Sequence, residues 1–325
     1  MDRTGRPVGK LFRELLSASG RTALNRGHTH RRQLGADSHG RSLLEHLAAD
    51  PRHGSRADWG ERLARGELFL DGVAARSDAP LRAGAWLEWR RPPWEEPVVP
   101  LCAALLHRDD DFLAVAKPAG LPTMPSGGRF LDHTLLALVR RRFPEASLLH
   151  RLDRGTSGLV LMARTVRARR AGAELFQSGR IERRYRGRVV GAPAGDALTL
   201  DAPIGEVPHP RIGRAFAVQP DGRAAATHVE VIERDGATTL VAIRIATGRP
   251  HQIRIHLAAA GLPLVGEPFF GPGGRPRGEG PALPGDPGYL LHAETLAFAH
   301  PFDGRRLALH CPPPIALRRR DEAPG

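Results

Sequence analysis

The chain has little cysteine and almost no lysine, and it lacks any long apolar run. Cys102 and Cys311 are its only cysteines, which excludes a four-cysteine zinc site and argues against a fold held by disulfides. No apolar stretch approaches the roughly 20 residues that a membrane-spanning helix needs, and the first residues lack the apolar core of a secretion signal. We therefore expect a cytoplasmic protein that does not enter a membrane.

Positive charge is abundant even though lysine is scarce, because arginine supplies nearly all of it. The 325 residues contain 48 Lys+Arg against 35 Asp+Glu, a formal net charge of +13, and the only lysines are Lys10 and Lys117. Such an excess suits a polyanionic partner. A GC-rich coding bias would also enrich arginine together with alanine, glycine and proline, so charge alone does not identify the partner.

Composition and turn signals predict a small N-terminal unit followed by a larger domain, and the chain is long enough for both. Residues 1–40 are basic and show no sustained period, so we expect a mobile extension in which LFRELL, residues 11–16, forms a short helix. The remaining predicted segments are a compact module at 41–90, a stiff proline-rich linker at 91–100, the main domain at 101–318 and a tail at 319–325.

The compact module reads as two helices and a hairpin. Ser42 and Ser55 are placed as helix N-caps, and Gly66 is placed as the stop of the second helix. Strand-like residues 68–70 are followed by Asp71-Gly72, a good hairpin turn, and residues 85–89 suggest another strand.

The stretch HRLDRGTSGL, residues 150–159, places one carboxylate on a turn ahead of a buried strand. Asp153 lies between two arginines, Arg151 and Arg154, and the glycine and hydroxyl residues after it favour a turn. The continuous apolar strand that begins at Leu159 would anchor this turn on a sheet. An acid on a rigid turn between cations suits catalysis, whereas a structural aspartate that caps the turn would show the same local pattern.

Further motifs stand in order around that stretch: KPAG at 117–120, ERRYRGRVVG around Tyr185, TGRPHQIRIHLAAAGLPLVGE at 247–267 and LHAETLAFAHP at 291–301. Together they resemble the RluA-type pseudouridine synthases over about residues 100–315. The resemblance implies an enzyme that isomerises uridines of structured RNA, ribosomal or transfer, to pseudouridine. It also implies a mixed α+β fold, with a largely antiparallel central sheet, flanking helices and an active-site cleft.

The same resemblance gives roles to individual residues. Asp153 would be the catalytic carboxylate, acting either by attack on carbon 1 of the ribose or by removal of the 2′ proton. Arg254 would pair with Asp153 and keep it ionised, and Tyr185 would stack on the uracil and help to remove the proton from carbon 5. Arg151 would fill the space left by the flipped base, so unpaired RNA is the easier target. The predicted RNA-contacting residues of the main domain are Arg151, Arg154, Lys117 and Arg249.

The small module resembles the ribosomal-protein-type RNA-binding module that often precedes this catalytic domain. Arg56, Arg62 and Arg65 would then share a basic face toward RNA phosphates. An ordinary solvated helix face explains the same arginines about as well.

No metal or organic cofactor is expected, and we interpret His251 and His256 as structural hydrogen-bonding histidines. Glu267 stands where the family more often has aspartate, and residues 269–271 replace its tyrosine-containing end, which questions a supporting loop but not the chemistry. Residues 271–288 are rich in glycine and proline and predict a long mobile loop. We expect a monomer whose partner is RNA.

Two other functions remain open at this point. A non-catalytic RNA-binding protein that retained the fold should have lost at least one of Asp153, Tyr185 and Arg254, and all three are present. A hydrolase of glycosidic bonds normally uses two paired carboxylates, whereas these motifs supply one convincing acid. Release of free uracil from RNA would favour the hydrolase.

Overall fold

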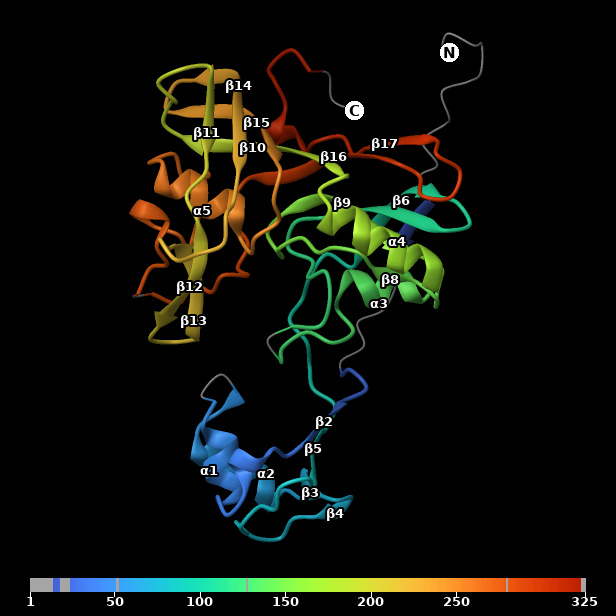
Figure 1. Cartoon of the computed structure of the whole chain (residues 1–325), viewed down its shortest axis with the longest axis vertical. Coiled ribbons are helices and arrows are strands. Elements are labelled where there is room, and N and C mark those ends of the chain that lie inside the picture. The colour runs from blue at the N-terminus through green and yellow to red at the C-terminus, as the bar shows by residue number, and fades with distance from the viewer. Residues whose placement is uncertain (1–13, 18–23, 51–52, 127, 279, 323–325) are drawn as a thin grey trace.

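The computed structural model describes residues 14–17, 24–50, 53–126, 128–278 and 280–322, which form a small N-terminal module and a main domain (Figure 1). The elements of the module are β2 (His28–Gln33), η1 (Ala36–Ser38), α1 (Leu43–Ala48), α2 (Arg56–Ala64), β3 (Leu68–Leu70), β4 (Val73–Ala74) and β5 (Trp86–Arg91). Those of the main domain are β1 (Glu14–Ser17), β6 (Cys102–Arg108), β7 (Phe112–Lys117), α3 (Leu135–Arg140), β8 (Ser147–Leu148), β9 (Ser157–Ala163), α4 (Val166–Gln177), β10 (Glu182–Val190), β11 (Ala197–Leu200), β12 (Ile204–His209), β13 (Gly213–Val218), β14 (Thr227–Asp235), β15 (Thr238–Ile245), α5 (Gln252–Ala259), η3 (Pro272–Gly274), β16 (Leu291–Ala299), β17 (Arg306–His310) and η4 (Ile315–Leu317).

Within the described residues, the main domain is built on an 11-stranded sheet. Its order is β1-β6-β7-β9-β16-β10-β15-β14-β11, with β17 beside β16 and β8 beside β9. Its strand pairs are antiparallel except that of β9 and β16, which is parallel. The predicted mixed α+β fold with a largely antiparallel central sheet is confirmed. In the same ranges, no helix is long and apolar enough to cross a membrane.

Side chains of the central strands alternate between the two faces of this sheet, as a strand period of two requires. Val115 of β7 belongs to the same core cluster as Leu135 of α3. Leu161 of β9 belongs to a second cluster with Leu175 of α4. Full burial of one such side chain stabilises the fold by about 1.5–3 kcal/mol. The helices α3 and α4 therefore cover opposite faces, and the strand that follows Asp153 is held from both sides.

The junction of β9 and β16 requires a glycine directly after the Asp153 turn. Gly158 has a φ of 111° and pairs with Ala293 of β16. A Cβ atom at position 158 would overlap the backbone of Ala293. The close approach of the two parallel strands therefore fixes the chain only a few residues after Asp153.

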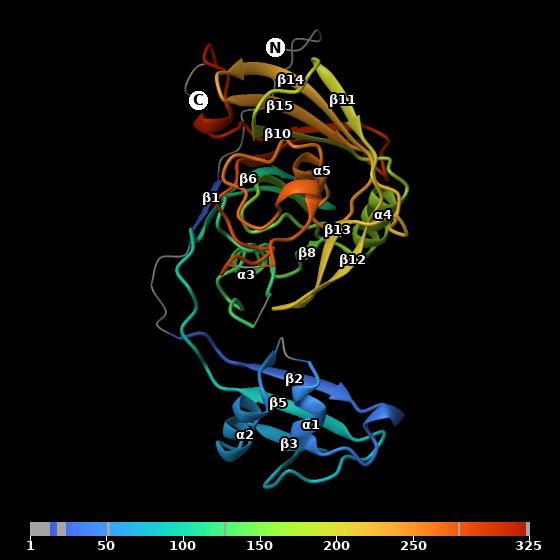
Figure 2. The ribbon, with the colours of Figure 1, turned by 90° about the vertical axis from the view of Figure 1, so that its left-hand side faces the viewer.

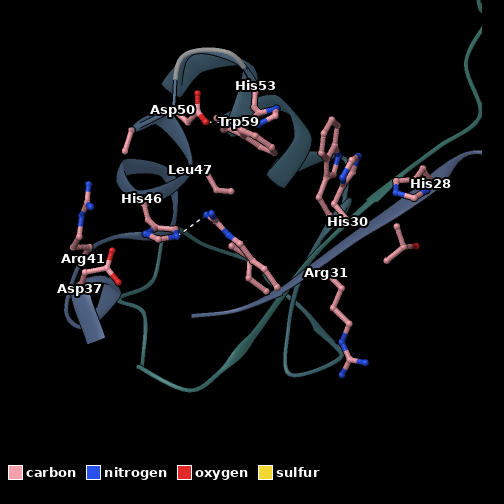
Figure 3. A pocket seen from close by; sticks show the side chains of 15 residues that line it. His28, His30, Arg31, Asp37, Arg41, His46, Leu47, Asp50, His53 and Trp59 are labelled. Atoms are coloured by element: carbon pink, nitrogen blue, oxygen red, sulfur yellow. Dashed lines mark hydrogen bonds and ion pairs between the residues drawn. The ribbon is translucent and has the colours of Figure 1, made fainter. Parts of the chain in front are cut away.

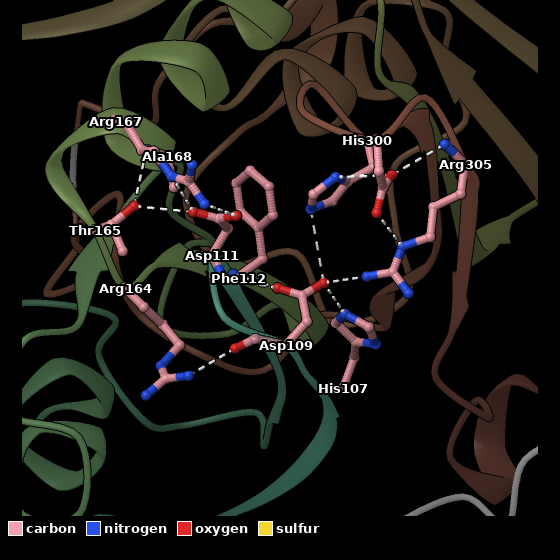
Figure 4. A network of polar contacts seen from close by, with 11 residues as sticks. His107, Asp109, Asp111, Phe112, Arg164, Thr165, Arg167, Ala168, His300 and Arg305 are labelled. Atoms are coloured by element: carbon pink, nitrogen blue, oxygen red, sulfur yellow. Dashed lines mark hydrogen bonds and ion pairs between the residues drawn. The ribbon is translucent and has the colours of Figure 1, made fainter.

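A polar network ties the turn between β6 and β7 to two other parts of the domain (Figure 4). Asp109 accepts a hydrogen bond from Arg305 at 2.6 Å and lies 2.8 Å from the Nε2 atom of His107. Asp111 accepts two hydrogen bonds from Arg167 at the start of α4, both of 2.9 Å. These contacts hold the start of α4 and the β16–β17 turn beside the turn that precedes β7.

The small module has a four-stranded sheet, in the order β2-β5-β3-β4, packed against two helices. The predicted caps of α1 and α2 are confirmed, because Ser42 accepts from the backbone of Glu45 and Ser55 forms a capping box with Asp58. The predicted hairpin is also confirmed, with both turn residues, Asp71-Gly72, at positive φ.

Residues 1–40, predicted as a mobile extension with a short helix, contain two strands. Residues 14–17 form β1, which pairs with β6, so the helix prediction is wrong there; residues 11–13 lie outside the described ranges. Residues 28–33 form β2, which pairs with β5 inside the module. All six residues of β2, HTHRRQ, are exposed, so no alternation of apolar residues indicated a strand.

The middle of the proline-rich segment 91–100 is hydrogen-bonded to the main domain. The carboxylate of Glu96 accepts hydrogen bonds of 2.8–2.9 Å from the backbone N–H groups of residues 131–133. It also accepts one of 2.8 Å from the side chain of Asn25. Figure 2 shows the segment after β5 running from the module to the main domain, and the hydrogen bond from Asn25 to Glu96 ties this segment to the chain just before β2.

Gly158→Ala is expected to destabilise the main domain more than an ordinary glycine at positive φ would. Gly213, with a φ of 76° and open space around it, is the matched control. The control substitution should cost about 1–2 kcal/mol of backbone strain. Gly158→Ala should cost more, because the backbone of Ala293 must also move. Urea unfolding of both variants measures this difference, and equal losses would contradict the close approach as the constraint.

Candidate active site

Asp153 lies where three segments far apart in the sequence meet. Residues at the start of α5 hold its side chain. The Oδ2 atom of Asp153 lies 2.6 Å from Nδ1 of His251, which directly precedes α5, and accepts a hydrogen bond of 3.1 Å from Arg254. A carboxylate only accepts, so Nδ1 of His251 carries the proton. Within the described residues Oδ1 has no hydrogen-bond partner, and Asp153 lines a hollow of about 340 Å³. One oxygen is therefore anchored and the other is left for a ligand.

Arg254 is buried and makes contacts on every side. Its side chain is 1% exposed, and its Nε and Nη2 atoms donate to Glu267 at 2.8 and 2.7 Å. Its guanidinium carbon lies 4.1 Å from the ring centre of Tyr289, and Nη1 donates to the carbonyl of Pro284. The predicted pair with Asp153 is present, but the partner in the bidentate ion pair is Glu267, a role that the sequence reasoning missed.

Glu267 is itself fixed by the chain that follows it. Its Oε1 atom accepts from the backbone N–H groups of Phe269 and Phe270 at 2.9 and 3.0 Å. The substitution of residues 269–271 relative to the family pattern therefore leaves a well-supported loop. The signal that could have indicated this is a lone acid 13 residues after Arg254 in an otherwise apolar segment.

The charges around Asp153 favour its ionised form. Burial alone would raise the pKa of the Asp153 carboxyl, but the charge and hydrogen bonds of His251 and Arg254 hold that pKa well below its usual range. Burial would likewise lower the pKa of Arg254, yet the carboxylates of Glu267 and Asp153 raise it. The site thus holds a permanent cation beside a permanent carboxylate.

His251 has a backbone conformation that aims its ring at Asp153. It precedes α5 with a φ of 55°, one of two non-glycine residues at positive φ in the described chain. His256, by contrast, bridges Thr227 and the carbonyl of Ala202 at 2.9 and 2.8 Å, as a structural histidine does. The sequence reasoning grouped the two histidines and so missed the contact of His251 with the candidate carboxylate.

Lys117 supports the turn that carries Asp153 through hydrogen bonds to backbone carbonyls. Its ammonium donates to the carbonyls of Leu121, Pro118 and Arg154 at 2.8, 3.0 and 3.2 Å. Lys117 is 1% exposed and its ammonium is engaged inside the protein, so its contact with RNA stays a prediction. Burial lowers its pKa to about 7.

Tyr185 lies on β10 and faces a second hollow, of about 720 Å³. It is 8% exposed, burial raises its pKa, and its hydroxyl makes no hydrogen bond within the described residues. The exposed residue Arg151 borders both this hollow and that of Asp153. The structure therefore brings Asp153, Arg254 and His251 into contact and places Tyr185 in the neighbouring hollow. Arg249, another predicted RNA contact, also lines this second hollow.

The loop predicted as mobile, residues 271–288, contacts the candidate site through residues near the loop's C-terminal end. Pro284 accepts from Arg254, and Asp286 forms an ion pair of 3.0 Å with Arg154. Arg154 is thus paired inside the protein, and its contact with RNA stays a prediction.

The three arginines predicted to bind RNA in the small module also have partners there. Arg56 pairs with Asp78 at 2.6 Å, and Arg65 pairs with Glu67 at 2.7 Å. Arg62 donates to the carbonyl of His53 and stacks on two tryptophans, Trp59 and Trp89. They do not form a shared unpaired face, so their part in RNA binding stays a prediction.

The module carries another hollow, of about 710 Å³, beside β2 (Figure 3). The ring of His30 stacks on Trp89, and Arg32 lies 2.6 Å from Nε2 of His46. Although several histidines gather here, the described residues contain no group of three or more His, Cys, Asp or Glu side chains placed to hold a metal ion.

Comparisons with known proteins agree on one family. Residues 111–259 match the family model described as RNA pseudouridylate synthase. An RNA pseudouridine synthase of Synechocystis, itself described as uncharacterized, is 39% identical over 277 residues, which are 85% of this chain and 95% of that protein. Ribosomal large subunit pseudouridine synthase D of Xanthomonas campestris is 37% identical over 284 residues, covering 82% of this chain and 83% of that protein.

One solved structure supports the fold alone. Human RNA pseudouridylate synthase domain containing 1 superposes with a TM-score of 0.52 at 24% sequence identity. The match covers 66% of this chain and 86% of the human chain.

Glu267→Gln should destabilise the main domain and disorder the carboxylate of Asp153. The substitution leaves the buried Arg254 without its bidentate partner, which should cost about 3 kcal/mol or more. Glu182→Gln is the control, because Glu182 forms an exposed pair with Arg184 and its loss should cost less than about 1 kcal/mol. Urea unfolding measures both losses. A similar small loss in the two variants would contradict the central position of the Arg254–Glu267 pair.

Lys117 should make the stability of the protein rise with pH. Its pKa is about 7 in the folded state against an ordinary 10.5, so between these values the unfolded chain binds more protons than the folded one. Wild-type protein should therefore gain roughly 2 kcal/mol of stability relative to Lys117→Met between about pH 7 and pH 9. Urea unfolding of both proteins across this range tests the prediction, and a constant difference would refute it.

Proposed function

Because this chain belongs to the RNA pseudouridine synthase family, and so is an isomerase that acts on RNA, we propose that Asp153 is the carboxylate that drives the isomerisation of uridine. The observation that carries this proposal is the unequal use of its two oxygens. His251 and Arg254 both hold Oδ2, whereas Oδ1 has no partner in the described chain. An ionised, oriented carboxylate with a free oxygen is what the chemistry needs.

The reaction breaks the bond between ribose carbon 1 and nitrogen 1 of uracil and forms one from the same ribose carbon to carbon 5. Nitrogen 1 ends with a proton, and carbon 5 loses one to solvent. Oδ1 of Asp153 serves this exchange either by bonding to ribose carbon 1 or by accepting the 2′ proton. In both routes the carboxylate must be ionised, and the depressed pKa of Asp153 supports that state at neutral pH.

Other residues support Asp153 without reacting. Arg254 and His251 are positioning residues, because both hold Oδ2 and Arg254 supplies a permanent positive charge that keeps the carboxylate ionised. Tyr185 stacks on the uracil. Its hydroxyl, which makes no hydrogen bond in the described chain, helps to remove the proton from carbon 5. Arg151 is exposed between the two hollows and enters the space left by the flipped base.

The substrate that we propose is a uridine in a structured RNA, ribosomal or transfer, modified in the cytoplasm by a monomeric enzyme. The name of the Xanthomonas relative specifies the large ribosomal subunit for that protein. Mapping pseudouridines in cellular RNA with and without this protein identifies the RNA and the position.

A hydrolase remains the less favoured candidate. Glu267 is the second acid of the site, but its side chain is 2% exposed and both its oxygens are bound to Arg254. Hydrolysis through paired carboxylates would need a second acid that can reach the substrate. The engagement of Glu267 therefore favours isomerisation by Asp153 alone.

Asp153→Asn should abolish turnover, because an amide neither attacks the sugar carbon nor accepts its proton effectively. RNA binding should survive or tighten, since a negative charge near phosphates is removed. Tritium release from carbon 5 of labelled uridine in RNA measures turnover, and filter binding measures affinity.

The matched control is Asp196→Asn, which removes an exposed carboxylate paired with Arg234 and should leave tritium release unchanged. Substantial tritium release by Asp153→Asn would overturn the assignment of the catalytic carboxylate. Release of free uracil by the wild-type protein would instead favour the hydrolase.

A further inference from the structure

The hollow beside Tyr185 carries positive charge without any carboxylate to balance it. No aspartate or glutamate lines it, whereas four arginines do: Arg151, Arg183, Arg223 and Arg249. Within the part of the chain that the structure describes, none of the four forms an ion pair. By contrast, Arg56 and Arg65 of the small module each form an ion pair with an acid.

Arg183 is the most constrained of the four. It is 8% exposed, its Nη2 atom reaches the carbonyl of Ala246 at 3.3 Å, and its Nε atom is buried without a hydrogen-bond partner among the described residues. Gly248 makes room for it, because a Cβ atom there would lie 2.8 Å from Nη1 of Arg183. Burial lowers its pKa. A buried guanidinium normally has an acidic partner, so this one is incomplete.

The neighbouring arginines of the same strand show what Arg183 lacks. Arg184 pairs with Glu182 and Arg186 pairs with Glu294, at 2.5 and 2.7 Å, and Arg188 lies 3.7 Å from Asp235. Three of the four arginines of β10 thus have an acid beside them, from β10 itself, β16 or β14. The exception, Arg183, is the one that faces the hollow with Tyr185.

Arg223 and Arg249, which line the same hollow, lie near each other without any acid of the described ranges between them. Arg249 donates through Nε to the carbonyl of Ala224, and this leaves its other guanidinium nitrogens without a partner in the described chain. Burial and the nearby charge of Arg223 lower its pKa. Cations that crowd one another in the free protein are relieved when an anion binds between them.

We propose that Arg183, Arg223 and Arg249 form a phosphate subsite that holds a backbone phosphate of the RNA beside the target uridine. This inference rests on the proposed function, because it takes the uridine to lie between Asp153 and Tyr185. A phosphate fits better than the uracil itself, since uracil is neutral and offers no charge to three guanidinium groups. Arginine forks also match the oxygens of a phosphate in pairs.

The test compares Arg183→Met and Arg183→Lys with the control Arg184→Met. Arg184 follows Arg183 in β10, carries the same charge and is exposed beside Glu182, so its removal changes the net charge equally. Affinity is measured by fluorescence anisotropy with a short labelled oligouridine over a series of salt concentrations. Turnover is measured by tritium release from uridine-labelled bulk RNA of cells that lack the protein.

Arg183→Met should raise KM about tenfold to a hundredfold, as expected for a lost charge-assisted contact, and change kcat little. The slope of log affinity against log salt should become shallower by about 0.7, the value for one phosphate contact on a single strand. Arg183→Lys should recover part of the affinity. Arg184→Met should show a smaller KM increase and the wild-type slope.

A thermal melt separates this role from a structural one. Removal of a buried charge that has no acid should leave the melting temperature of Arg183→Met unchanged or raise it. A lower melting temperature together with wild-type KM and salt slope would overturn the proposal. Weaker binding with an unchanged salt slope would also overturn it, because it would indicate a contact with the neutral base.

Two further outcomes distinguish the sources of the phosphate and the level of failure. Inorganic phosphate that stabilises the wild type but not Arg183→Met, with equal RNA affinity for both, would assign the subsite to free phosphate and overturn the RNA contact. An inactive wild-type protein would defeat the proposed function, whereas an active wild type with an equally active and equally tight Arg183→Met would defeat the subsite alone.

Discussion

A single guanidinium buried between two carboxylates holds the candidate site together. Arg254 joins Asp153 on the turn before β9, Glu267 after α5 and Pro284 in the long loop, and it lies on the ring of Tyr289. An unpaired charge at that depth would cost several kcal/mol, so the fold is stable only when these segments converge. The same contacts that satisfy the arginine therefore place the carboxylate.

Several backbone details follow from that convergence. A Cβ atom at Gly155 would overlap the ring of Tyr289, and one at Gly266 would overlap the carbonyl of Gly288. Gly158 brings β9 against β16 in the same way. Glycine at these positions lets the turn, the loop and the strand approach closely enough for Arg254 to reach both acids. The result is a carboxylate fixed in advance of substrate binding, which is how electrostatic catalysis avoids reorganisation.

The sequence predicted those parts of the fold in which local chemistry and tertiary packing agree. Helices with strong caps, such as the one that begins after Ser55, and the turn that carries Asp153 could be placed because each signal is local. Strand β2 could not, because its residues are polar and exposed and it forms only by pairing with β5. The surroundings of Lys117 could not be predicted for a related reason: a lysine gives no local sign that three carbonyls will surround it. Glu267 and His251 were likewise recognisable only once α5 was packed against the turn.

The phosphate subsite proposed for RNA rests on the distribution of ion pairs rather than on the net charge. The formal charge of +13 suggests a broadly basic surface. Many arginines, however, including Arg56, Arg65 and Arg186, form ion pairs with neighbouring acids. A paired arginine attracts phosphate weakly, because its own carboxylate must be displaced or tolerated. The arginines around Tyr185 have no such competitor in the described chain. These arginines lie beside Asp153, and the proposed subsite would therefore hold the backbone of a substrate that enters the cleft.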